Sequence, residues 1–117
     1  MQLHNPRVFS ISLIFCVILS SCTRDKGSPI TCESLNVTYA VDIKPIILIY
    51  CATPKCHVTN GLGKGDYTQY NVVKFTVDAG FFQKRVIVDR DMPPAVLLHD
   101  TLIQKIKCWL NDGAPDN

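Results

Sequence analysis

The apolar residues of this chain are unevenly distributed, and their distribution limits what can fold. The stretch from Val8 to Leu19 is apolar apart from two serines and follows a short polar start that carries Arg7. It is about the length of a signal-peptide core and too short for a bilayer span, so we expect residues 1–21 to be an export signal. Removing the first 21 of 117 residues leaves 96, enough for one small domain. A domain of that size usually needs a disulfide, a metal or a cofactor to support its core.

The apolar stretch ends in Leu19-Ser20-Ser21-Cys22, small residues closing on a cysteine, which resembles the lipobox of bacterial lipoproteins. Acylation of Cys22 would supply more than one hydrocarbon chain, which is what durable membrane attachment requires. We therefore expect an exported protein that is lipid-anchored to a bacterial membrane and faces the periplasm. The alternative is a plain secretory signal with a chance cysteine near its end.

The segment Thr23–Pro29 is polar, contains glycine and proline, and has no apolar period, so it predicts a flexible tether over about residues 22–35. We expect folding to begin near Cys32, with a single domain over 36–117. Loss of Arg7, the only charged side chain of the first 21 residues, lowers the formal net charge from +2 to +1. This balance gives no indication of a nucleic-acid partner.

Apolar residues recur at helical spacing in several segments of this domain. The first runs from Asp42, a possible N-cap, through Pro45 in the first turn and straight into Cys51. Its apolar face consists of Ile43, Ile46, Ile47 and Tyr50. The same spacing predicts helices over 67–77 and 101–110, the latter capped by Asp100 or His99 and ended by Gly113. Residues 81–88 fit either a helix or an extended segment.

The glycines between residues 58 and 66 could suggest a phosphate-binding loop. That interpretation is disfavoured because a preceding strand and the Lys-Ser/Thr pair are both absent, so we expect a surface loop.

The residues Cys51-Ala-Thr-Pro-Lys-Cys56-His57 carry the clearest chemical signal. Two thiols can attach to the vinyl groups of a haem, and the adjacent imidazole is then held under the ring, where it can bind the iron. The usual motif has two residues between the cysteines, whereas this one has four, as at some sites of multihaem c-type cytochromes. We expect one covalently bound haem c per chain.

The six cysteines can then all be assigned. Cys16 leaves with the signal, Cys22 carries lipid, and the motif takes two more. Cys32 and Cys108 remain, and they are candidates for a disulfide because the compartment outside the cytoplasm is oxidising.

Met92 is the only methionine left after signal removal, and it is followed by Pro93 and Pro94. The prolines restrict the backbone here, so the thioether would be held on a stiff loop and is a suitable sixth iron ligand. The alternative is that Met92 simply fills space in the core.

The order of these features resembles the short monohaem cytochrome c domains of bacterial lipoproteins, over roughly residues 36–115. The shared order is a helix, Cys-x4-Cys-His, a glycine-rich loop, Gly65 to Tyr70, Lys84 to Val88, Asp91-Met-Pro-Pro94, and Ile106 to Pro115. The resemblance implies an all-α, cytochrome c-like fold whose N- and C-terminal helices cross around a haem crevice.

The resemblance also implies His57 and Met92 as iron ligands on opposite faces of the haem, and Arg85 as the partner of a haem propionate. A solvated surface charge is the alternative for Arg85. His99 is a helix cap, a surface residue or a rival distal ligand. Tyr70 and Trp109 are expected in the core or the crevice wall.

Ligation by His and Met fills both axial sites of iron, so the implied function is outer-sphere electron transfer with redox proteins, not catalysis. One alternative is a haem- or metal-based sensor lipoprotein in which Met92 is displaced. Another is a structural zinc site at Cys51, Cys56 and His57, which the adjacency of the last two disfavours.

Overall fold

The computed structural model describes residues 31–117, and within this range every regular element is helical. The predicted export signal, Cys16 and Cys22 lie outside the described residues. The elements are α1 (Cys32–Leu35), the π-helix η1 (Tyr39–Ile43), α2 (Lys44–Tyr50), α3 (Tyr70–Asp78), α4 (Phe81–Gln83), the π-helix η2 (Lys84–Val88) and α5 (Asp100–Asn111). The expectation of an all-α fold is confirmed for this part of the chain.

The first long helix begins earlier than its apolar pattern predicted. Thr38, not Asp42, is its N-cap, and the Thr38 hydroxyl accepts a hydrogen bond from the Val41 N–H at 3.4 Å. Asp42 lies inside η1 and accepts from the Thr38 N–H at 3.0 Å, so the two residues cap the helix reciprocally. Asp42 also accepts from Lys105 Nζ at 2.7 Å, and this bond holds the pKa of its carboxyl below the usual value.

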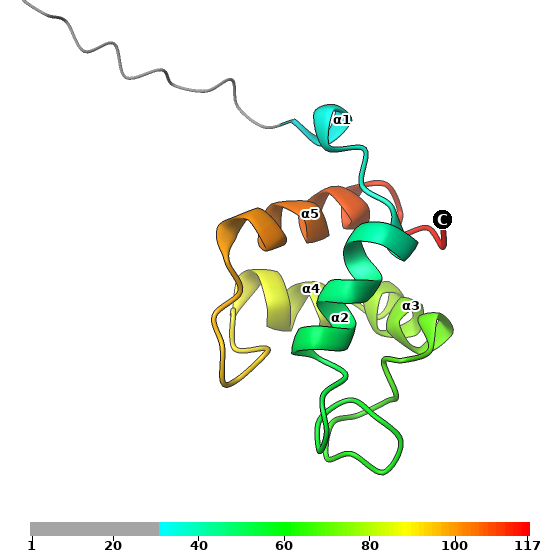
Figure 1. Cartoon of the computed structure of the whole chain (residues 1–117), viewed down its shortest axis with the longest axis vertical. Helices are drawn as coiled ribbons and strands as arrows, with labels where there is room; N and C mark the ends of the chain where they lie inside the picture. The colour runs from blue at the N-terminus through cyan, green and yellow to red at the C-terminus, as the bar shows by residue number, and fades with distance from the viewer. Residues whose placement is uncertain (1–30) are drawn as a thin grey trace, which may run out of the picture.

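Figure 1 shows η1 and α2 as one continuous helix. Its N-terminal end contacts α5, and the loop that contains the motif follows its C-terminal end. Three residues of the predicted apolar face are buried, with Ile43, Ile46 and Ile47 at most 5% exposed, and the fourth, Tyr50, is partly buried. Trp109 of α5 is completely buried at the centre of the core, and its indole N–H donates to the Pro115 carbonyl at 2.9 Å. The continuous helix of η1 and α2 thus fixes the position of the Cys-His motif relative to the core.

A disulfide joins Cys32 of α1 to Cys108 of α5, the pair left over by the cysteine count. The Cα atoms are 5.2 Å apart, within the usual range for a bridged pair. The last four residues of the expected tether range, 32–35, are helical. In the part of the chain described here, no helix has the length and apolar character needed to cross a bilayer.

Helices α3 and α4 pack against each other, and the helix expected over 67–77 runs from Tyr70 to Asp78. Val73 and Val77 of α3 are buried, and the segment 81–88, open between two conformations, is helical with Phe82 and Val86 buried. Tyr70 is partly buried and its hydroxyl donates to the Ala114 carbonyl at 2.8 Å. Its contacts are therefore those of a core residue.

Candidate cofactor site

The Cys-His motif forms a tight turn directly after α2. The Cys51 N–H still bonds the Ile47 carbonyl at 2.8 Å, so the first thiol sits at the end of the helix. The Cys56 N–H donates to Thr53 O at 2.9 Å, and the His57 N–H returns to Cys51 O at 3.1 Å. The four-residue spacer therefore closes on itself and brings His57 back beside Cys51.

The two thiols of the motif occupy different environments. Cys51 is buried, with 8% of its surface exposed, while Cys56 is half-buried, and both are free. Burial raises the pKa of the Cys51 thiol to about 11, and the neighbouring Cys56 adds to this effect. The Cys51 thiol is thus uncharged at neutral pH.

The ring of His57 is held by one nitrogen and leaves the other available. Its Nδ1 lies 3.0 Å from the carbonyl oxygen of Lys64. A carbonyl can only accept, so Nδ1 carries the proton and the lone pair of neutral His57 is on Nε2. The ring also stacks on Tyr67, with centroids 4.0 Å apart and planes 14° from parallel.

Glycines in the following loop allow the backbone to approach the motif closely. A Cβ atom at Gly61 would lie 1.9 Å from the Cys56 carbonyl oxygen, and one at Gly63 would lie 2.8 Å from Nδ1 of His57. The sequence predicted a surface loop here and did not identify these two residues, Lys64 or Tyr67 as supports of His57. The only available signal was the alternation of glycines immediately after the motif.

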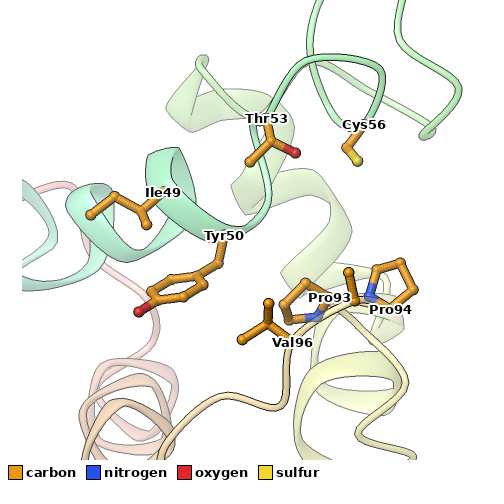
Figure 2. A pocket seen from close by; sticks show the side chains of 8 residues that line it. Ile49, Tyr50, Thr53, Cys56, Pro93, Pro94 and Val96 are labelled. Carbon is orange, nitrogen blue, oxygen red and sulfur yellow. The ribbon is translucent and has the colours of Figure 1, made fainter.

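An apolar cavity of about 140 Å³ lies between the motif and the loop that follows Met92. Figure 2 shows the Cys56 side chain on one side of it and the Pro93 and Pro94 rings on the other. The remaining lining residues are Ile49, Tyr50, Thr53, Ala95 and Val96. Of the predicted site residues, Cys56 lines this cavity, whereas Cys51, His57 and Met92 do not.

Met92 itself is partly buried and packs against the core, beside the cavity wall rather than in it. Its N–H and that of Asp91 both donate to the Arg85 carbonyl, at 3.3 and 3.1 Å. The Arg85 side chain donates through Nε to Asp91 Oδ1 at 2.8 Å. This bond lowers the pKa of the Asp91 carboxyl. Arg85 therefore supports the start of the loop of residues 90–98, which we call the Met92 loop.

His99 occupies the N-cap position of α5 without a capping hydrogen bond from its side chain. The side chain is exposed, and its Nδ1 lies 3.5 Å from Thr101 Oγ1. Within residues 31–117, no three His, Cys, Asp or Glu side chains are grouped so as to hold a metal ion.

Comparison with protein family models, with curated proteins and with solved structures finds no match to this chain.

Proposed function

We propose that this chain is a membrane-anchored, monohaem c-type cytochrome that transfers electrons by an outer-sphere mechanism. The observation that carries the proposal is the hydrogen bond from His57 Nδ1 to the Lys64 carbonyl at 3.0 Å. A metal-binding histidine commonly donates its other ring N–H to a backbone carbonyl, which fixes the tautomer and the ring orientation. His57 has this arrangement one residue after a free thiol.

The residues around the cavity are chemically suited to a haem. The motif supplies two free thiols, of which Cys56 lines the cavity and Cys51 does not, and the lining is predominantly apolar, as a macrocycle requires. The cavity, at about 140 Å³, is smaller than the roughly 300–1,000 Å³ typical of cofactor sites. Binding therefore requires the Met92 loop to move outward, and residues 93–98 make no backbone–backbone hydrogen bonds within the described chain that would oppose this.

The remaining roles follow from the same arrangement. His57 would bind the iron through Nε2, and Met92 would bind it through its thioether. When bound, the haem supplies an iron that alternates between the ferric and ferrous states. The chain itself would hold both axial positions, exclude water through the apolar lining, and reach the membrane through acylated Cys22.

The finer fold proposed here is cytochrome c-like, with the first and last helices crossing. It is supported by the contact of η1 with α5 and by the position of the motif directly after α2. Arg85 would have its other guanidinium nitrogens for a propionate, because Nε is the atom bonded to Asp91.

The test is a haem stain of the mature protein on a denaturing gel. We expect stain on the chain, and none in the Cys51→Ala/Cys56→Ala double variant. The single variants serve as matched controls, because each keeps one thioether and should retain stain with an altered visible spectrum. Equal stain in the double variant, or none in the wild type, would contradict the proposal. A spectrum that changes on adding a gaseous ligand to the wild type would favour a sensor.

A further inference from the structure

The His57 ring is restrained by neighbours on a single short segment. The Gly63 backbone lies against Nδ1, Cε1 and Cγ of the ring, so closely that a Cβ there would be 2.8–2.9 Å from all three atoms. The Lys64 carbonyl accepts from Nδ1 at 3.0 Å, and the Tyr67 ring stacks at 4.0 Å. We call these residues, Gly63, Lys64 and Tyr67, the imidazole clamp.

The clamp is attached to the motif by its own backbone. The Gly63 N–H donates to Cys56 O at 3.2 Å, and the Tyr67 N–H donates to His57 O at 2.9 Å. Between them, Asp66 accepts from the Thr59 hydroxyl at 2.5 Å and from the Thr68 N–H at 3.0 Å. The clamp is therefore positioned by bonds that do not involve the imidazole.

The clamp also connects His57 to the core. The Tyr67 ring lies 6.5 Å from that of Phe82, which is 3% exposed and makes an edge contact with Trp109 at 6.3 Å. Such centroid separations are typical of aromatic pairs that interact. The position of the Tyr67 ring, and with it the plane of the imidazole, is thus set from the centre of the domain.

We propose that Gly63 and Tyr67 are positioning residues that fix the plane of the His57 imidazole before any metal binds. This inference rests on the proposed function, because a fixed imidazole plane has a consequence for the metal only if His57 is an iron ligand. Ligands that are held in place by their surroundings bind and tune a metal better than mobile ones. Gly63 is required here for space: its φ lies outside the left-handed region, and the three atoms nearest to a methyl group at this position all belong to the His57 ring.

The first measurement uses the full chain prepared without cofactor. We expect NMR to show His57 protonated on Nδ1, with the exchange of that proton slowed by the bond to Lys64. Tyr67→Leu and Gly63→Ala should each accelerate this exchange about fivefold, the factor that corresponds to loss of one net hydrogen bond. Tyr67→Phe should leave the exchange as in the wild type, because it keeps the ring that stacks on His57. Leu62→Ala is the control, since this neighbour is 92% exposed.

The second measurement uses the haem-loaded chain. Tyr67→Leu and Gly63→Ala should change the ferric EPR g values and the reduction potential while haem remains attached, whereas Leu62→Ala should change neither. Unchanged exchange of the imidazole proton in both variants would contradict the proposal that Gly63 and Tyr67 position His57. If Tyr67→Leu does not fold, the result for Gly63→Ala is the test. Accelerated exchange in a chain that never takes up haem would support the clamp and contradict the proposed function.

Discussion

The segment from Cys51 to Tyr67 and the Met92 loop, residues 90–98, border the same cavity but are held in different ways. The first is bonded to itself throughout, with backbone hydrogen bonds returning from Cys56, His57, Gly63 and Tyr67 to earlier residues of the segment. The Met92 loop is held only at its ends. Arg85 bonds its start, and Arg90 donates to the Leu98 carbonyl at 3.0 Å near its end.

Exposed apolar side chains occur in both regions: Val96 and Leu97 of the Met92 loop are 50% and 72% exposed, and Leu62 of the first segment is 92% exposed. The regions differ in their hydrogen bonds. A region with few bonds and exposed apolar side chains opens locally at low cost in free energy. We infer that the Cys-His side of the site is preformed and that the Met92 side adapts to what binds.

The largest expected effect comes from removing the disulfide. Cys32→Ser/Cys108→Ser opens a covalent loop with a sequence separation of 76, which should lower the free energy of unfolding by about 4 kcal/mol. Hydrogen exchange should then accelerate in residues 51–67, which open with the whole domain. Exchange in residues 95–98 should change little, because these open locally. Equal acceleration in both regions, measured by mass spectrometry, would show that they form one cooperative unit.

Met92→Ala should act on one side of the site only. We expect haem to remain attached through the cysteines, while the spin state changes, the sixth position accepts added ligands, and the reduction potential falls. Loss of a partly buried side chain should also cost roughly 1–2 kcal/mol of stability. An unaltered spectrum and potential would identify Met92 as core packing and move attention to His99.

Arg90→Gln should loosen the end of the Met92 loop. The Arg90 amino group bonds the Leu98 carbonyl and lies 3.5 Å from Asp100, and Arg90 itself has a left-handed φ of 53°. We expect local opening to become easier by about 1 kcal/mol, seen as faster exchange in residues 95–98 alone. Lys107→Gln removes the same charge from an exposed position and should have no such effect. Unchanged exchange in Arg90→Gln would mean that the loop is held elsewhere.

The smallest expected effect is a pH dependence at the start of the loop. The folded-state pKa of Asp91 is lowered, chiefly by the hydrogen bond from Arg85. The contribution of this pair is therefore complete above the unfolded pKa, near 3.8, and is lost as the pH falls through the lower folded value. In the wild type, the Arg85 Nε–H resonance should broaden as the pH falls from 3.8 through the lower folded-state pKa of Asp91. In Asp91→Asn the resonance should not change with pH in this way. An identical pH dependence in this variant would show that a group other than Asp91 causes it.

The sequence predicts the helical face of Ile43, Ile46 and Ile47 because burial follows a simple 3.6-residue period. It does not predict the Thr38 cap, because several polar residues near a helix start can fill that role and only geometry selects one. The supports of His57 are harder still. The Lys64 carbonyl is a backbone atom with no residue signature, and the stacking of Tyr67 depends on how the glycine loop turns. Arg85 could be singled out by resemblance, but its bond to Asp91 is a contact that neither residue indicates alone.

The central claim is that Cys51, Cys56 and His57 hold one covalent haem, and mass spectrometry of the denatured, protease-digested mature protein tests it most directly. We predict a peptide spanning residues 51–57 that carries the added mass of one haem, with neither thiol free to react with an alkylating reagent. A peptide of unmodified mass whose Cys51 and Cys56 are both alkylated, or are joined to each other in a disulfide, would contradict the account.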